Sequence, residues 1–288
     1  MRPPRFHRAP DFAAPESPGD ISLNRRFALV TGASSGIGAA IARVYAGHGY
    51  DLALTARRGD RLHQLADDVR LRHGADSLVI PADLARPEAC REILAEIEAN
   101  GRVVDALVNN AGFAVPGSYA ATRWEDQQAF LQVLLTSVCE LTHRVLPGML
   151  EQKFGRIVNV ASLAGLAPGA PGQTLYGATK GFLVRFSQSL HLESQGTGVH
   201  VSALCPGFTY SEFHDVTGTR ARVQEGVPAW LWLGADEVAA AGYEAAEANR
   251  PICVPGAPNK ALAALAKVIP DEWSMALLSS QLGRIRGA

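Results

Sequence analysis

Apolar residues follow two different rhythms along this chain. Short runs of consecutive apolar residues are typical of strands that are buried on both faces of a sheet. Longer stretches with an apolar residue every three or four positions, such as 39–46 and 60–73, predict helices. Six strands are expected, at residues 27–30, 51–55, 77–80, 105–108, 156–160 and 199–204.

The order of these elements predicts the fold class. Strands that alternate with helices form βαβ units, and the crossovers between parallel strands are right-handed. The pattern therefore predicts an α/β protein with a single Rossmann-type, doubly wound parallel sheet that carries helices on both faces. The sequence contains no internal repeat and no linker after residue 24, which favours one folded domain.

The composition excludes several classes of protein. The 288 residues carry a net charge of −1, so no basic field is available to hold nucleic acid. No run of about 18 apolar residues is present, and no membrane span is predicted. The four cysteines are scattered without a CxxC pair and the histidines lack metal-like spacing, so no metal site is expected. Free cysteines favour a reducing compartment, and we expect the protein to be cytoplasmic.

A glycine-rich turn follows the first predicted strand and opens the first predicted helix. Its sequence, TGASSGIG over residues 31–38, spaces the glycines as GxxxGxG. Glycines allow the backbone to approach a pyrophosphate, which then lies at the positive end of the helix. This position in a βαβ unit predicts a dinucleotide site formed by Gly32, Ser34, Ser35, Gly36, Ile37 and Gly38.

The end of the second strand selects the dinucleotide. An acidic residue there would bind the ribose 2′-hydroxyl of NAD, but this chain has Ala56 followed by Arg57 and Arg58. Two guanidinium groups suit the 2′-phosphate of NADP(H), which is therefore expected in preference to NAD(H). Alternatively, the arginine pair is a solvated helix cap, and Asp60 nearby argues in the same direction.

Two further strand ends complete the predicted dinucleotide site. Asp83-Leu84 follows the third strand, where the carboxylate can cap a loop or meet the adenine edge. Asn109-Asn110-Ala111-Gly112 ends the fourth strand. An asparagine there can tie two strand ends together by hydrogen bonds to the backbone, while the small Ala111-Gly112 pair admits the cofactor.

Candidate acid–base chemistry lies later in the chain, in the YxxxK motif of Tyr176 and Lys180. Residues four apart share one face of a helix, and an ammonium beside a phenol is expected to lower the tyrosine pKa. Such a tyrosine can exchange a proton with an alcohol or carbonyl oxygen. Ser162, just past the fifth strand, supplies a hydroxyl that can orient the same oxygen.

Taken together, these motifs resemble the classical short-chain dehydrogenase/reductase family over about residues 25–256. The resemblance implies hydride transfer between nicotinamide and a carbonyl carbon, with a small-molecule carbonyl or alcohol as substrate. It makes Tyr176 the general acid in reduction, Lys180 the residue that holds the nicotinamide ribose, and Ser162 the residue that positions the substrate oxygen. Pro206 and Gly207 would border the nicotinamide.

The chain departs from the family pattern at three places. Leu134 stands where the family usually has a catalytic asparagine, so the alternative of a dinucleotide-binding protein with little or no turnover stays open. Ser162 and Tyr176 are 14 residues apart instead of the usual 13, an excess that the loop 167–172 can absorb. Ser211 replaces a threonine that commonly lies near the nicotinamide amide.

The remaining segments define the expected domain organisation. Residues 1–24, rich in proline and arginine, are expected to be a disordered tail before the dinucleotide-binding catalytic domain, 25–256. Residues 208–234 lack periodicity and predict a lid over a bulky or apolar substrate, because they contain Phe208, Tyr210, Phe213, Trp230 and Trp232. Residues 257–288 are expected to form a helical extension broken at Pro270, and the apolar stretch 124–152 predicts a homodimer or homotetramer.

Overall fold

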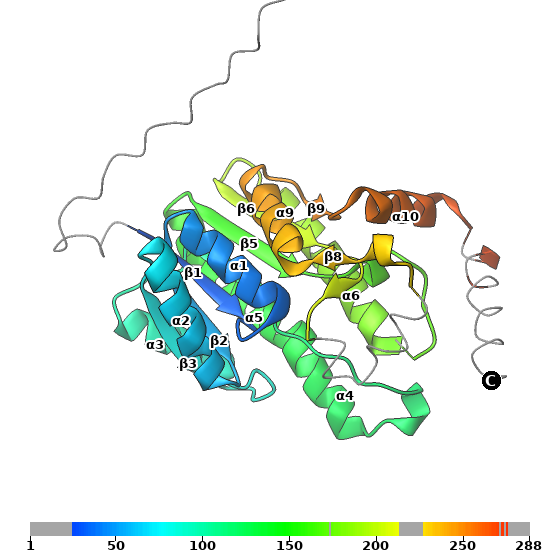
Figure 1. Ribbon diagram of the computed structural model, residues 1–288, viewed down its shortest axis with the longest axis horizontal. Helices are drawn as coiled ribbons and strands as arrows, with labels where there is room; N and C mark the ends of the chain where they lie inside the picture. Colours follow the sequence, from blue (N-terminus) through cyan, green and yellow to red (C-terminus); the bar gives the residue numbers. More distant parts are fainter. Residues whose placement is uncertain (1–24, 173, 213–226, 271, 274, 276–288) are drawn as a thin grey trace, which may run out of the picture.

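The computed structural model describes residues 25–172, 174–212, 227–270, 272–273 and 275 (Figure 1). The expected tail, 1–24, lies outside the described residues, as does the end of the expected extension, 276–288. Within the described part, a parallel sheet is covered by helices on both faces, as the hydrophobic pattern predicts (Figure 1).

The main sheet has seven parallel strands in the order β3-β2-β1-β4-β5-β6-β9. The first six repeat the strand order of the Rossmann fold. The bounds are β1 Arg26–Thr31, β2 Tyr50–Ala56, β3 Ser77–Pro81, β4 Ala106–Asn109, β5 Gly155–Val160, β6 Val199–Leu204 and β9 Ile252–Cys253. The six predicted strands lie within about one residue of these bounds. β9 was not predicted, because two residues are too short to show a period.

One face of the sheet is covered by α1 (Gly36–Gly47), α2 (Gly59–His73) and α9 (Ala235–Glu247). Each helix buries an apolar stripe in the same core, exemplified by Ile41 and Leu65, which are almost fully shielded from solvent. The two predicted helices on this face, 39–46 and 60–73, are both present, and α1 starts earlier because Gly36 opens it directly from the turn.

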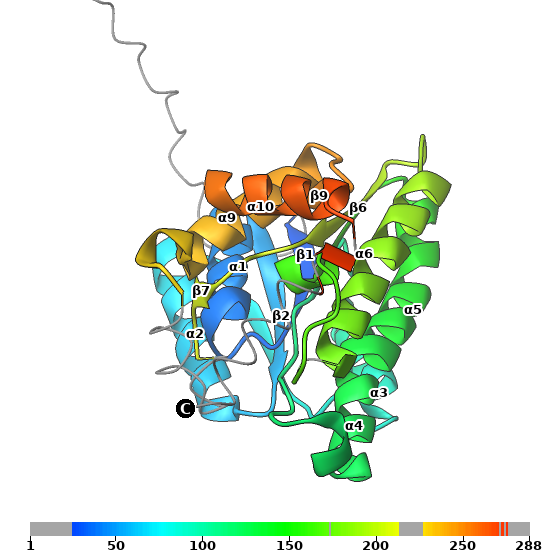
Figure 2. The same ribbon diagram turned by 90° about the vertical axis from the view of Figure 1, so that its right-hand side faces the viewer.

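The other face carries α3 (Ala89–Ala99) and α6 (Thr174–Glu193), with a long helix between them in the chain. That helix is α4 (Trp124–Leu131) continued by a π-helical turn, η2 (Gln132–Thr136), and by α5 (Ser137–Glu151). Figure 2 shows α5 and α6 running alongside each other on the outside of the sheet. The π-helical turn places one extra residue in the helix, a distortion that is frequent at functional sites.

The long helix, Trp124–Glu151, is long and apolar enough to cross a membrane by length and composition, a test that no other helix in the described residues meets. Of its apolar window, 44% is buried inside the protein. Its buried positions pack on α3, β4 and β5.

The described residues of the predicted lid form short elements. β7 (Thr209–Tyr210) and β8 (Leu233–Gly234) pair outside the main sheet, and η4 (Ala229–Leu231) precedes β8. Residues 213–226, and with them Phe213, lie outside the described residues. The extension begins with α10 (Ala257–Val268), in which Pro258 stands in the first turn, where its missing N–H costs nothing.

Candidate active site

The carboxyl ends of β1, β2, β4, β5 and β6 open onto one cavity of about 1000 Å³, called the cleft below. This is the edge at which ligands bind in open α/β sheets. Every predicted site residue except Gly38 lines the cleft: Gly32, Ser34, Ser35, Gly36, Ile37, Arg57, Arg58, Asp83, Leu84, Asn110, Ala111, Gly112, Ser162, Tyr176, Lys180, Pro206 and Gly207.

The glycine-rich turn is fixed by Asn110, as predicted from the fourth strand. The Asn110 amide donates to the backbone oxygens of Thr31 (2.9 Å) and Gly32 (3.2 Å), which ties the end of β4 to the end of β1. Gly38 lies behind the turn, because a Cβ there would lie 2.4 Å from both the Asn110 amide nitrogen and the Gly32 oxygen. Gly38 therefore allows close packing of α1 and does not face the cleft.

The arginine pair after β2 divides into two roles. Arg58 reaches the glycine-rich turn and donates to Ser34 Oγ (3.0 Å) and Ser35 Oγ (2.8 Å). Arg57 is exposed, and among the described residues it has no hydrogen bond or ion pair. The predicted anion site is therefore built mainly by Arg58 and the two serines.

Asp83 caps the loop that follows β3, the first of the two roles expected for it. Its carboxylate accepts from the Ala85 backbone N–H at 3.0 Å. Leu84 beside it is buried and also lines the cleft, so the two residues form the wall at the β3 side.

At the opposite end of the cleft, α6 presents the YxxxK pair. Lys180 is 6% exposed, and its Nζ donates to the Val160 backbone oxygen at 2.7 Å, at the end of β5. The same Nζ lies 5.7 Å from the centre of the Tyr176 ring. A hydrogen bond joins the hydroxyls of Tyr176 and Ser162, so the extra residue between them is absorbed by the intervening loop, as predicted.

The pKa of Tyr176 is raised above its usual value, contrary to the expectation from the sequence. Burial of the phenol disfavours its charged form, and this effect outweighs the hydrogen bond from Ser162, which lowers the pKa. Burial also lowers the pKa of Lys180 to about 8. Both shifts have the same cause, burial, although Lys180 is buried and Tyr176 is half-buried.

Leu134 lies in the π-helical turn and lines the cleft. Its side chain is 1% exposed and packs against Gly112, where a Cβ would lie 3.5 Å from the Leu134 Cγ. The position that the family pattern assigns to an asparagine is therefore filled by apolar packing at the end of β4.

The aromatic residues of the predicted lid serve different purposes. Phe208 lines the cleft, as a lid residue should. Trp232 is 8% exposed and stacks on Tyr210, with ring centres 4.9 Å apart, so it is a packing residue of the β7–β8 pair. Trp230 is 64% exposed. Among the described aromatic residues of this segment, Phe208 alone lines the cleft, and the lid over 208–234 stays a prediction.

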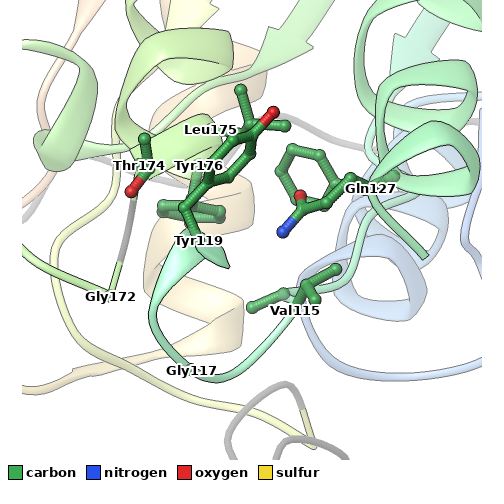
Figure 3. Close-up of a pocket in the computed structure, with 10 residues that line it drawn as sticks. Val115, Gly117, Tyr119, Gln127, Gly172, Thr174, Leu175 and Tyr176 are labelled. Carbon is green, nitrogen blue, oxygen red and sulfur yellow. The ribbon is translucent and has the colours of Figure 1, made fainter. Parts of the chain in front are cut away.

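A second, smaller pocket of about 60 Å³ adjoins Tyr176 (Figure 3). Figure 3 shows it between the loop after β4, α4 and the start of α6. Its lining is mostly apolar, with Val115, Phe130 and Leu175, and Gln127 contributes an amide that donates to Thr122 Oγ1 at 2.8 Å. The pocket extends the space available next to Tyr176.

Two side chains at the site were missed by the sequence analysis. Glu212, which follows β7, forms ion pairs with Arg58 and Arg61. Asn259 of α10 is 1% exposed, and its amide packs against Gly207, where a Cβ would lie 2.6 Å from Oδ1. Neither residue belongs to a motif, and each contacts a residue far away in the chain, so no local pattern could reveal these contacts.

The model of the family described as short chain dehydrogenase matches residues 26–221. The chain belongs to the short-chain dehydrogenase family. The match covers the glycine-rich turn, Ser162, Tyr176 and Lys180, which the fold brings together in the cleft.

Known short-chain dehydrogenases resemble the chain over most of its length. The NADP-dependent 3-hydroxy acid dehydrogenase YdfG of Salmonella typhi is 38% identical over 182 residues, which cover 62% of this chain and 71% of that protein. The structure of a short-chain dehydrogenase from Sphingobium yanoikuyae in complex with NADPH is 30% identical, with a TM-score of 0.74, and covers 91% of this chain and 96% of that chain.

The fold also occurs with the other nicotinamide cofactor. A short-chain dehydrogenase/reductase from Burkholderia phymatum in complex with NAD is 27% identical, with a TM-score of 0.74, and covers 84% of this chain and 92% of that chain. The family and fold are therefore compatible with either cofactor, and the residues at the end of β2 must distinguish between them. No cluster of three or more metal-ligating side chains occurs within the residues that the structure describes.

Proposed function

We propose that this protein is an NADP(H)-dependent oxidoreductase that interconverts a carbonyl and an alcohol. The observation that supports this most is the meeting of Tyr176, Ser162 and Lys180 in the same cleft as the glycine-rich turn. A proton donor and a dinucleotide cradle in one cavity are what a carbonyl reductase requires.

The donor groups of the cleft fit NADP(H). Arg58 with Ser34 and Ser35 offers a cation and hydroxyls at the end of β2, and the first turn of α1 opens beside them. A helix N-terminus and a guanidinium group both favour phosphate oxygens. The 2′-phosphate would be held by Arg58, with Arg57 available from the rim.

The chain's own residues carry the proton chemistry. In reduction, the Tyr176 hydroxyl donates its proton to the carbonyl oxygen, and its raised pKa keeps it protonated at neutral pH. Ser162 holds the same oxygen by a hydrogen bond. Lys180, charged below a pH of about 8, stabilises the phenolate that remains and binds the nicotinamide ribose. When bound, the reduced nicotinamide would supply the hydride to the carbonyl carbon.

The cleft suits a bulky or apolar small molecule. Phe208, Val133 and Leu134 give apolar walls to the cleft, whose volume of about 1000 Å³ includes the proposed dinucleotide site. The small pocket beside Tyr176 extends this space. The proposed substrates are therefore acyl, aromatic or polycyclic ketones and their alcohols.

The four free cysteines suit a cytoplasmic setting.

A second candidate function is dinucleotide binding with little turnover. It is favoured by Leu134, which fills the place of the family's asparagine with a side chain that cannot hydrogen-bond. Oxidation of NADPH with a panel of bulky ketones, followed at 340 nm, distinguishes the two candidates. Turnover with any of them supports the oxidoreductase, whereas tight NADPH binding without turnover across the panel supports the second candidate.

The cofactor preference has its own test. The dissociation constants of NADPH and NADH are measured by calorimetry for the unaltered protein, for Arg58→Leu and for Arg57→Leu. NADPH should bind more tightly than NADH, and Arg58→Leu should weaken NADPH by at least about 10-fold, because charged hydrogen bonds are lost. Arg57→Leu is the matched control and should have the smaller effect. Equal affinities for both cofactors in the unaltered protein would contradict the proposal.

A further inference from the structure

The guanidinium group of Arg58 faces the adenosine end of the cleft. It already forms an ion pair with a carboxylate of the same chain, that of Glu212. Arg58 Nη1 lies 2.8 Å from Glu212 Oε2, and Arg61 pairs with the other oxygen of the same carboxylate. Arg58 also donates to Ser34 and Ser35. One carboxylate is therefore bound by the arginine that, with the two serines, forms the proposed phosphate site.

The segment that carries Glu212 crosses the glycine-rich turn. It begins at Gly207, at the nicotinamide side of the cleft, and we call residues 207–212 the strap. A Cβ on Gly36 would lie 2.9 Å from the Ser211 Cβ, so the strap lies directly against the first residue of α1. Residues 207–209, 211 and 212 of the strap line the cleft.

The strength of this contact is suited to a reversible latch. Glu212 has its pKa lowered to about 2, because Arg58 and Arg61 donate hydrogen bonds to it, and it is therefore anionic at neutral pH. The side chains stay partly in water, with Arg58 42% and Glu212 33% exposed. Ion pairs at this exposure are weak, whereas a phosphate monoester brings nearly two charges and three acceptor oxygens.

We propose that Glu212 is a specificity-determining latch, which occupies the 2′-phosphate site and is displaced by the phosphate of NADP(H). This inference rests on the proposed function. Displacement frees the strap from Arg58 and Arg61, so recognition of the phosphate is coupled to the position of Phe208 over the substrate space. A dinucleotide without the phosphate leaves the latch in place.

The test uses 2′,5′-ADP and 5′-AMP, which differ only in the 2′-phosphate, as calorimetric probes on the full chain. In Glu212→Gln, the affinity for 2′,5′-ADP should rise by about 3- to 10-fold, because the phosphate no longer competes with a carboxylate. The affinity for 5′-AMP should stay unchanged. Asp68→Asn is the matched control, because Asp68 is likewise held between two arginines, Arg43 and Arg72, but does not line the cleft.

A second variant separates displacement from simple charge repulsion. Glu212→Asp keeps the negative charge but shortens the side chain, so it should lose the contact and raise the affinity for 2′,5′-ADP almost as much as Glu212→Gln. An affinity that rises only in Glu212→Gln would show repulsion without a latch and overturn the proposal. Equal gains for both probes, or no gain, would also overturn it.

The same measurements distinguish failure of the latch from failure of the proposed function. If the unaltered protein binds NADPH and turns over ketones while Glu212→Gln leaves its affinities unchanged, only the latch is wrong. If 2′,5′-ADP binds no more tightly than 5′-AMP in the unaltered protein and in both Glu212 variants, the proposed preference for NADP(H) is wrong. The latch proposal is then wrong as well.

Discussion

Burial acts on Tyr176 and Lys180 in opposite directions. Both side chains lose water when α6 packs on the sheet, so the phenol pKa rises and the ammonium pKa falls. Each shift favours the neutral form. Tyr176 is therefore protonated at neutral pH, and the cost of keeping Lys180 charged falls on the stability of the fold.

This cost predicts the effect of Lys180→Met. A lysine pKa lowered from 10.5 to about 8 corresponds to about 3 kcal/mol of unfavourable burial at pH 7. Methionine removes that cost but leaves the Val160 oxygen without its donor, which offsets about 1 kcal/mol. The variant should therefore unfold at higher urea concentration at pH 7.

The pH dependence of the stability difference between Lys180→Met and the unaltered protein tests whether the buried charge causes it. The folded protein binds fewer protons than the unfolded chain between about pH 8 and 10.5, so the stability of the unaltered protein rises with pH across this window. The advantage of Lys180→Met should disappear by about pH 10.5. A constant advantage at all pH values would show that packing, and not the buried charge, is responsible.

Removing one oxygen atom tests the proposed acid. Tyr176→Phe keeps the ring and its packing but removes the proton donor, so turnover should fall by about 100-fold or more. The affinity for NADPH, measured by calorimetry, should stay within about twofold of that of the unaltered protein. This measurement is the control for correct folding. If more than about a tenth of the rate remained, another group would have to supply the proton.

A substitution of Leu134 tests how apolar packing in the π-helical turn affects stability and turnover. Because its side chain is 1% exposed and contacts Gly112, an asparagine there would bury an unpaired amide. Leu134→Asn should cost about 1–3 kcal/mol in stability. Any gain in turnover should be at most about 13-fold, the value of one neutral hydrogen bond. Melting temperature and rate, measured on both proteins, separate the two effects.

At the scale of elements, α6 and the short helix after β5 (η3, Leu163–Gly165) are locked together by Gly165. A Cβ on Gly165 would lie 2.5 Å from the backbone carbon of Lys180, and backbone cannot rotate away. Gly165→Ala should therefore displace α6, lower the melting temperature and reduce turnover. Gly169→Ala, in the same loop but with nothing within 4 Å, is the matched control and should leave both unchanged.

The sequence predicts elements well where the signal is local. Six strands of the main sheet, the glycine-rich turn and the YxxxK face follow from patterns within a few residues of one another. Glu212 could not be predicted, because its partner Arg58 is 154 residues away in the chain. The raised pKa of Tyr176 was also missed, since burial depends on how α6 packs against the sheet and not on the spacing of the motif.

For the whole molecule, the apolar residues exposed on the outer helices predict association. Phe182 of α6 is 38% exposed and stacks on Phe186, with ring centres 5.7 Å apart, and Leu192 of the same helix is 64% exposed. We expect a dimer or tetramer in which α5 and α6 pair with a second copy. Light scattering at micromolar concentration should give at least twice the mass of one chain.

A charge on this face should separate the copies. Phe182→Glu is expected to lower the mass seen by light scattering, while Leu71→Glu, on the highly exposed surface of α2, should not. A monomeric unaltered protein would contradict the expected assembly without affecting the proposed chemistry.

The two-residue strand β9 has a consequence for how the chain is made. β9 pairs Ile252 and Cys253 with Ala203 and Leu204, and it covers the carboxyl end of the free edge of β6. During synthesis, β6 emerges long before β9, so this end of its edge stays open to strands of other nascent chains until β9 arrives. A chain ending before Pro251 would keep that end open permanently, and it should aggregate more readily although every residue of the proposed chemistry is present.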